Sequence, residues 1–184
     1  MALGEQFPEI LEAARLGTEW AWRVLHDDFA PGLIAYLSAR GASDPEDLAG
    51  EAFLGLYRAL PRFDGGYPEL RTLAFTIAHH RLLDDRRSRR RRPEAGPGEA
   101  LREVQGPADV EGEVIENIRT EEIRRLIETL SPDQQQVLLL RIIGGLGAEE
   151  IARVVGKGAW AVRALQRRGL AALGKKISRE AIQL

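Results

Sequence analysis

Apolar residues recur at helical spacing along most of this chain, on both sides of one interrupting stretch. The pattern begins with Phe7, Ile10, Leu11 and Ala14, and comparable spacing returns before and after residues 93–118. No β-branched run alternates convincingly between apolar and polar positions, as a half-buried strand would require. The sequence therefore predicts an all-α protein.

The interrupting stretch, 93–118, has the composition of a linker. It contains three prolines and four glycines, and such a composition favours an extended, solvated chain. We therefore expect two small helical domains, 1–92 and 119–184, joined by a flexible acidic linker at 93–118.

The net charge of −2 at pH 7 conceals strong blocks of charge. Six of the seven residues from 86 to 92 are arginine, whereas 93–118 carries 7 acidic residues and 1 basic residue. Residues 119–184 carry 12 basic and 7 acidic residues. Basic blocks attract phosphate backbones, and alternating blocks indicate separate binding surfaces. An acidic linker can repel DNA, or it can occupy a protein groove that is built for DNA.

Several classes of function find no support in the residues. The chain has no cysteine, which excludes disulfides and thiolate metal sites. It also lacks the roughly 18 uninterrupted apolar residues of a membrane span and the pattern of a signal peptide. We expect a cytoplasmic protein that does not insert into membranes. No nucleophile–base pair or phosphate-binding loop is recognisable, so we expect no catalytic residue, no cofactor and no small-molecule substrate.

Two adjacent pairs, His79–His80 and Asp84–Asp85, raise the question of a metal site. Successive residues on a helix point about 100° apart, so neither pair converges on one ion. Asp84 is better explained by an ion pair with Arg81 or Arg87. We expect no bound metal.

Two helix starts are well marked. Asp44 before Pro45 and Ser131 before Pro132 each place a capping side chain ahead of a proline at the first helical position. Gln134 completes a capping-box pattern with Ser131. We expect helices to begin at both places.

The first helical segment and the helix of the arginine block are less sharply bounded. Pro31-Gly32 predicts a kink or a break in the segment from Phe7 to Leu37. A further helix is expected to begin near Leu70 and to run into the arginine block.

The C-terminal pattern is typical of a helix-turn-helix. A short helix is expected at Ala148–Val155, then a turn at residues 156–158, then a second helix from about Ala159 to Leu173. The apolar residues Val162 and Leu165 can anchor the second helix from behind.

The opposite face of that second helix is suited to DNA. Trp160, Arg163 and Arg167 follow one another at spacings of three and four, so they share a stripe. Arginine can bridge a guanine edge or hold a phosphate, and Lys157 in the turn is placed for the phosphate backbone. The alternative is a solvated cationic face on a small bundle. Turn, spacing and charge together favour DNA binding.

The arginine block of the first domain has two interpretations. Six arginines within seven residues repel one another, so a helix through them needs an anionic partner. Arginines together with the loop aromatics Phe63 and Tyr67 can grip a single strand and stack its unpaired bases. The alternative is a disordered basic tail that binds nonspecifically.

The residues on both sides of the linker resemble one family. DPEDLAGEAFLGLYRAL at 44–60 and FTIAHHRLLDDRR at 75–87 resemble region 2 of extracytoplasmic-function sigma factors. Residues 126–173 resemble sigma region 4, with LSP at 130–132, EIA at 150–152 and VRAL at 162–165. Two blocks in the right order are more specific than a lone helix-turn-helix. The resemblance implies a subunit that directs RNA polymerase to promoters and is not an enzyme.

The resemblance also implies partners. Region 2 of the family docks on the β′ clamp helices of core RNA polymerase and reads and opens the −10 element. Region 4 sits on the β flap and reads the −35 element as duplex, while the linker runs toward the RNA path. Many members are held by an anti-sigma factor. Whether this chain has such a partner stays open, as do its promoter and its inducing signal.

The resemblance assigns three sets of residues, position by position. The residues that would face the β′ clamp are Asp47, Glu51, Phe53 and Leu54. The residues that match the −10 reading region are Phe63, Tyr67, His79, His80, Asp84, Arg86 and Arg87. The residues that match the −35 reading region are Lys157, Trp160, Arg163 and Arg167.

The chain departs from the family pattern at several positions. His80 stands where asparagine is common, so the −10 base preference cannot be transferred. Gly50 replaces a common glutamine and weakens one contact to the clamp, and Leu73 replaces a common tryptophan. Gly147 lacks the usual capping hydroxyl, and Gly169 replaces an alanine, which loosens the long helix.

A second hypothesis stays beside the first. A stand-alone helix-turn-helix regulator would bind duplex DNA without polymerase. That hypothesis explains residues 119–184 but leaves the first domain without a role.

Overall fold

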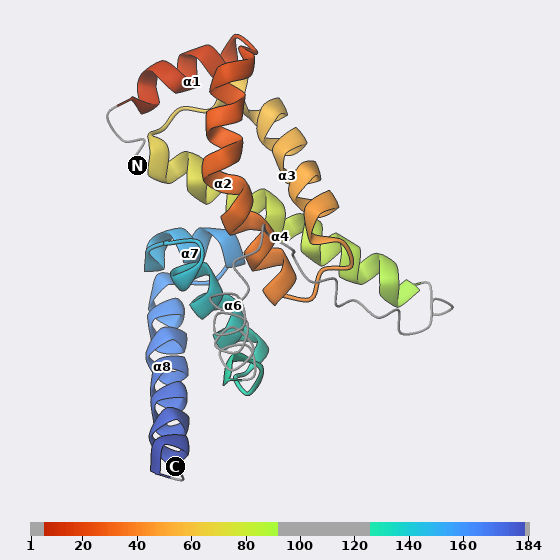
Figure 1. The fold of residues 1–184 in the computed structure, drawn as a ribbon. Helices are drawn as coiled ribbons and strands as arrows, with labels where there is room; N and C mark the ends of the chain where they lie inside the picture. Colours follow the sequence, from red (N-terminus) through yellow and green to blue (C-terminus); the bar gives the residue numbers. More distant parts are fainter. Residues whose placement is uncertain (1–5, 92–125, 183–184) are drawn as a thin grey trace, which may run out of the picture.

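A computed structural model describes residues 6–91 and 126–182, and in these residues the regular structure is entirely helical (Figure 1). The N-terminal part consists of α1 (Phe7–Arg15), α2 (Glu19–Ala39), α3 (Pro45–Ala59), a 3₁₀ turn η1 (Leu60–Arg62) and α4 (Tyr67–Arg91). The C-terminal part consists of α6 (Pro132–Ile142), α7 (Ala148–Val155) and α8 (Ala159–Ile182). The predicted all-α class is confirmed. The expected linker, 93–118, lies outside the described residues.

Both marked helix starts are confirmed. The Asp44 side chain accepts a hydrogen bond from the Asp47 backbone N–H at 3.0 Å. The Ser131 hydroxyl accepts from the Gln134 N–H at 3.3 Å, and the Gln134 amide oxygen accepts from the Ser131 N–H at 3.0 Å. These bonds satisfy N–H groups that a helix start leaves without intrahelical partners.

The first helical segment breaks at Gly17 and not at Pro31-Gly32, so of the predicted kink or break the break was wrong and the kink stays a prediction. Gly17 has φ +74°, a conformation that glycine adopts without strain. α2 runs through Pro31 and places Phe29 and Leu33, on either side of it, in the core. Burial on both sides holds the helix together despite the backbone hydrogen bond that proline cannot donate.

The core of the N-terminal part forms around α2, which contacts α1, α3 and α4. The Tyr36 ring meets the Phe75 ring edge to face, with 5.9 Å between centroids. α3 contributes Leu48, Ala52 and Leu56, which are spaced by four and therefore lie on one face. The four helices enclose one apolar core.

The C-terminal part is a helix-turn-helix placed on α6. Val154 of α7 and Val162 of α8 are buried on either side of the turn at Gly156, which has φ +65°. α8 continues past the expected end at Leu173 and extends away from the rest of the molecule (Figure 1). It also runs unbroken through Gly169, where an added Cβ would lie 2.8 Å from Leu138 Cδ1. This glycine therefore allows α8 to pack closely on α6.

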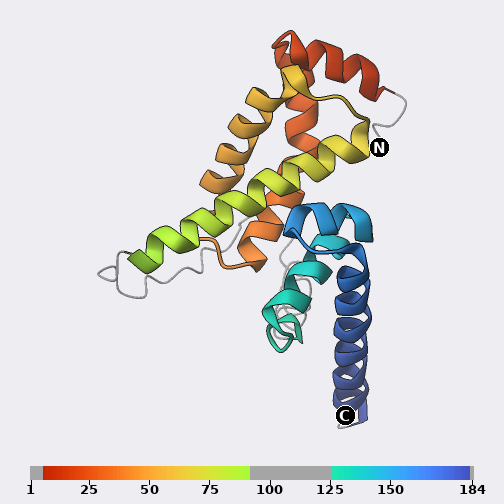
Figure 2. The same ribbon diagram turned by 180° about the vertical axis from the view of Figure 1, so that it is seen from behind.

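The two parts of the chain lie against each other. α4 contacts α7, and α2 contacts α6; Figure 2 shows α4 passing beside α7 at the head of the C-terminal part. One cluster of buried residues runs through both, and it includes Leu37 and Phe75 as well as Leu140 and Ile151. We call this state, in which the two parts pack against each other, the closed arrangement.

Replacing Gly156 with alanine should lower the free energy of unfolding by about 1 kcal/mol, because alanine is strained at positive φ. Urea unfolding measures this difference. Gly158→Ala is the matched control, since Gly158 lies in the same turn without positive φ and an added Cβ there meets no atom within 4 Å. Equal losses in both variants would contradict the strain argument.

Among the helices of residues 6–91 and 126–182, none is both long enough and apolar enough to span a bilayer.

Candidate nucleic-acid interface

The stripe on α8 faces solvent as expected. Trp160 is 81% exposed, and Arg163 and Arg167 are exposed beside it. Val162 is fully buried behind them, and Leu165 is half-buried. α8 therefore presents one indole and two guanidinium groups on a face that no described residue covers.

Acidic residues of the C-terminal part neutralise two of the cations near this stripe. The Lys157 ammonium lies 3.0 Å from an Asp133 carboxylate oxygen, and Arg163 pairs with Glu149. Arg167 has no acidic partner among the residues that the structure describes. Exposed ion pairs are worth little, so a DNA phosphate or a base edge can replace either carboxylate.

The start of α7 keeps one half of a capping box, although Gly147 lacks the hydroxyl that would supply the other half. The Glu150 carboxylate accepts a hydrogen bond from the Gly147 N–H at 2.5 Å. Glu150 also accepts from the Thr72 hydroxyl of α4 at 3.4 Å. The same carboxylate thus holds the first helix of the helix-turn-helix and touches the N-terminal part.

The exposed residues of α4 form a second polar face. His80, Asp84 and Arg87 follow at spacings of four and three and are all exposed. Arg87 bonds Asp84 at 3.1 Å, as expected, whereas Arg81 bonds Glu51 of α3 at 3.4 Å. A shallow cleft of about 390 Å³ opens beside Asp84 and Arg87. This face combines a base-sized aromatic ring with cations.

His79 lies elsewhere, at the contact between the two parts of the chain, where it is only 4% exposed. Its Nδ1 is 3.0 Å from the Tyr36 hydroxyl oxygen, and its Nε2 is 3.1 Å from the Gln136 side-chain nitrogen. A neutral imidazole, with one donor and one acceptor, satisfies both partners. DNA cannot reach His79 in this arrangement, so its −10 role stays a prediction for an arrangement in which α6 has moved away.

Burial lowers the pKa of His79 to about 4, and the nearby His80, Arg40 and Arg86 add to the shift. Because the folded pKa is below the ordinary value of about 6.5, the unfolded chain binds more protons between these values. Stability is therefore retained above pH 6.5 and lost as the pH falls toward 4. We expect His79 to make the free energy of unfolding about 2 kcal/mol lower at pH 4.5 than at pH 7.5.

Urea unfolding at a series of pH values measures this effect, with His79→Gln as the comparison. The variant should lose part of the decline between pH 6.5 and pH 4.5. An identical pH profile in both proteins would contradict the assignment to His79.

The two aromatics expected in a loop are engaged inside the N-terminal part, and Tyr67 is the first residue of α4, which begins before the expected start near Leu70. The Tyr67 ring lies 5.7 Å from the Phe7 ring and 5.8 Å from the Phe29 ring, and its hydroxyl donates to Asp28 at 2.6 Å. Burial, with Asp28 adding to it, raises the pKa of Tyr67 to about 12. Phe63 is half-buried. Base stacking by these rings therefore stays a prediction.

The residues expected at the polymerase clamp lie on α3. Asp47 and Leu54 are exposed, Leu54 by 58%, and Glu51 lies between them with its bond to Arg81. Positions 47, 51 and 54 share one helix face. Phe53 is half-buried, with its ring 4.9 Å from that of His26. The structure thus brings three of the four residues to one surface.

Sequence reasoning missed three residues that matter here. Tyr57 is 55% exposed and follows Leu54 by three, so helical spacing could have added it to the α3 face. Arg40 and Gln136 are buried polar residues at the contact between the two parts. No local sequence signal marks them, because their partners lie far away in the chain.

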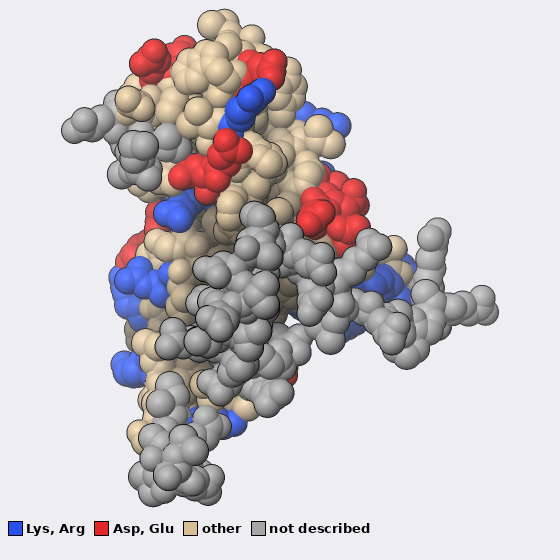
Figure 3. Space-filling view, viewed as in Figure 1, with Lys and Arg blue, Asp and Glu red and all other residues tan. Residues whose placement is uncertain are grey.

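The surface of the N-terminal part separates the two signs of charge. Acidic side chains gather over the start of α3, where Glu46 and Asp47 lie, and basic side chains gather at the end of α4 (Figure 3). The last turn of α4 carries Arg89, Arg90 and Arg91. The acidic surface suits a protein partner with basic groups, and the basic one suits phosphate.

The adjacent histidines and aspartates do not form a metal site in the part of the chain that the structure describes. No group of three or more suitable side chains gathers there. The His79 and His80 rings are 6.1 Å apart, and Asp84 and Asp85 bond to Arg87 and Arg89.

Comparison with known proteins relates both parts of the chain to one family. The sequence matches the models of sigma-70 region 2 over residues 25–92 and of sigma-70 region 4 over residues 120–173. It is 34% identical to the ECF RNA polymerase sigma factor SigD of Mycobacterium tuberculosis, over 95% of this chain and 85% of the relative. The chain belongs to the ECF RNA polymerase sigma factors. This sigma factor is also 30% identical to BldN of Streptomyces coelicolor, over 94% of the chain and 66% of that relative's length.

A solved structure supports the fold of this sigma factor. CnrH, solved in complex with the cytosolic domain of CnrY, superposes with a TM-score of 0.66 at 19% identity, over 92% of this chain and 96% of CnrH. The region 2 match takes in α3 and α4 and most of α2, and the region 4 match takes in α6, α7 and most of α8. As a member of this family, the chain is a sigma factor for transcription initiation, and the stand-alone regulator is not favoured.

Proposed function

We propose that this ECF sigma factor binds core RNA polymerase through α3 and reads its promoter with α4 and α8. The observation that carries the proposal is the exposed Trp160–Arg163–Arg167 stripe, backed by buried Val162, in a chain that matches both sigma regions. In this proposal 1–92 forms the clamp-binding and −10 domain, 119–184 forms the −35 domain, and 93–118 is the linker between them.

The polymerase surface consists of Asp47, Glu51, Phe53 and Leu54. An exposed leucine beside two acids supports docking on a protein surface that offers apolar and basic groups. We add Tyr57, which continues the same face of α3 and is packed against Trp22 at 5.2 Å between ring centroids. The partner is the pair of β′ clamp helices, and the β flap is the partner of region 4.

The −10 surface is the outer face of α4. His80, Asp84 and Arg87 are exposed there, and Arg86 lies half-buried next to them. Guanidinium groups hold phosphates, and an imidazole ring can stack on an unpaired base. Phe63, Tyr67 and His79 join this surface only after rearrangement, since all three are engaged inside the described arrangement.

The −35 surface is the α8 stripe with Lys157. Two arginines on one face of a helix can read guanine edges in the major groove, and Lys157 can hold the backbone. Region 4 would then bind duplex DNA while region 2 holds the opened strand.

The contact between α4 and α7 supports a closed free protein that opens when it binds polymerase. The buried His79–Gln136 bond must break for the two reading surfaces to separate. The class of partner proposed for such a chain is an anti-sigma factor, because the structural neighbour CnrH was solved with the cytosolic domain of CnrY. We also propose that the protein works in the cytoplasm and has no enzymatic activity of its own.

Run-off transcription tests the proposal. Core bacterial RNA polymerase is incubated with a library of promoter fragments, with and without this protein. We expect discrete transcripts that appear only with the protein, and their start sites should reveal the −10 and −35 elements. Absence of transcripts together with absence of comigration with core polymerase would contradict the proposal.

A further inference from the structure

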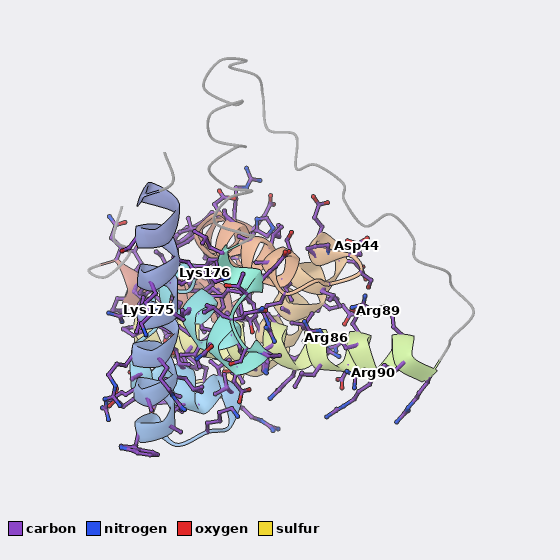
Figure 4. All side chains as sticks on the ribbon, turned by 90° about the horizontal axis from the view of Figure 1, so that it is seen from below. Asp44, Arg86, Arg89, Arg90, Lys175 and Lys176 are labelled. Carbon is purple, nitrogen blue, oxygen red and sulfur yellow. The ribbon has the colours of Figure 1, made fainter. Side chains whose placement is uncertain are left out.

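A basic cleft of about 540 Å³ lies between the C-terminal end of α2 and the last turns of α4. Arg40, Gly41, Arg86, Arg89 and Arg90 line it. Figure 4 shows the three α4 arginines along the end of that helix, far from Lys175 and Lys176 of α8. Gly41 has φ +72°, and an added Cβ there would meet no atom within 4 Å, so the backbone is open to the cleft.

Arg40 is the unusual member of this set. Its side chain is 7% exposed, and its Nε is buried without a hydrogen-bond partner in the described part of the chain. One of its terminal nitrogens donates to the Pro132 carbonyl, 3.3 Å away at the start of α6. The Nε itself is closed off from solvent, so Arg40 contributes the charge of its guanidinium to the cleft that it lines.

The positive charge of the cleft is only partly balanced. Asp85 accepts from Arg89 at 2.8 Å and from the Ser43 hydroxyl at 2.6 Å. Arg86 donates to the Arg40 carbonyl, and Arg89 also donates to the Gly41 carbonyl at 2.9 Å. Within residues 6–91 and 126–182, Arg40, Arg86 and Arg90 have no carboxylate partner.

The arginines also repel one another. Burial lowers the pKa of Arg86, and the charges of Arg40, Arg89 and Arg90 lower it further. The helix α2 ends at this point, and its terminal carbonyls offer only partial negative charge. A bound anion would remove the repulsion that these groups leave uncompensated.

We propose that this cleft binds the phosphate groups of a small polyphosphate, in the class of pyrophosphate or a nucleoside di- or triphosphate. Arginine is the side chain best suited to phosphate, because its planar fork donates two parallel hydrogen bonds. The cleft volume is in the range of small-molecule sites. This site goes beyond promoter recognition and shares only Arg86 with the proposed −10 surface.

The cleft favours a small ligand over a DNA backbone. A duplex or a bound strand touches exposed arginines such as Arg90, whereas Arg40 lines the same cleft at 7% exposure and adds its charge for a group small enough to enter it. Because Arg40 also holds Pro132, a ligand there would strengthen the contact between α2 and α6. The ligand would therefore favour the closed arrangement.

Titration calorimetry on the full-length free chain tests the site, with pyrophosphate as the probe at constant ionic strength. We expect saturable binding and a rise in Tm of about 5 °C at a pyrophosphate concentration of about 100 times Kd. Arg40→Met and Arg90→Gln should each weaken binding at least about 10-fold. Arg58→Gln, an exposed arginine of α3 outside the cleft, should bind like the parent.

Two results would overturn the site: no saturable binding of pyrophosphate, or binding that the Arg90→Gln variant retains in full. Arg90 is exposed, so this variant is expected to fold even where Arg40→Met does not. A promoter-free duplex, titrated in parallel, separates the sources of phosphate. Binding of duplex without binding of pyrophosphate assigns the arginines to DNA and overturns the small-ligand site. The titration does not depend on transcription. If pyrophosphate does not bind, the proposed sigma function is still tested separately by run-off transcription.

Discussion

Alanine at both Arg163 and Arg167 should lower promoter-specific transcription at least about 30-fold, because each bidentate arginine–base contact is worth about 1–3 kcal/mol. Both side chains are exposed on α8 and contribute nothing to the core behind it. Binding to core RNA polymerase should therefore be unchanged. Run-off transcription and comigration with core polymerase measure the two activities separately.

Glu149→Gln is the matched control for this prediction. It removes the carboxylate that pairs with Arg163 but keeps the arginine. Transcription should then stay at the parental level or rise, because Arg163 no longer has to break an ion pair before it contacts DNA. Equal loss of transcription and core binding in the double variant would mean misfolding or a wrong assignment of the surface.

The second large effect concerns the closed arrangement. Replacing Gln136 with leucine leaves the buried His79 ring without its partner on α6, at a cost of about 1–3 kcal/mol. The closed population should fall about 5- to 150-fold relative to the open one. Small-angle scattering should then report a larger radius of gyration for the free chain. A labelled −35 duplex should also bind the free chain more tightly.

Gln135→Leu separates this effect from damage to α6 itself. Gln135 is the neighbouring residue, but its amide donates to the Glu128 and Leu130 carbonyls within the C-terminal part. This variant should lose stability in the C-terminal part without opening the molecule. An unchanged radius of gyration in Gln136→Leu, or the same increase in both variants, would contradict the role given to the His79–Gln136 bond.

The features that local sequence determines could be predicted well. Asp44 and Ser131 accept hydrogen bonds from backbone N–H groups three residues away, so a few consecutive residues are enough to predict their capping roles. The α8 stripe follows from helical spacing alone. Arg163 and Arg167 are four residues apart and share the exposed face of the helix, whereas Val162 lies on the buried face. The resemblance to sigma regions 2 and 4 identified the family, and the comparisons with known proteins confirm it.

The remaining features depend on contacts between distant residues. Pro31 stays inside α2 because the core holds the helix on both sides of it, which no local pattern shows. One side of His79 is covered by α6, which supplies Gln136 57 residues further on. The same contact creates the buried position of Arg40, so neither the closed arrangement nor the basic cleft had a signal in the sequence.

The ion pairs of the C-terminal part have a consequence for how DNA binding depends on salt. Of the three cations on the proposed −35 surface, Lys157 and Arg163 already have a carboxylate as their counterion. When Lys157 or Arg163 moves to the DNA, the freed carboxylate of Asp133 or Glu149 lies near the DNA and offsets part of the charge that the cation brings. Even if all three cations reach phosphates, the slope of log K against log salt concentration should therefore be less steep than about −2.7, the value for three free cations. Region 4 would hold its promoter with an affinity that changes less with salt than the number of its cations suggests.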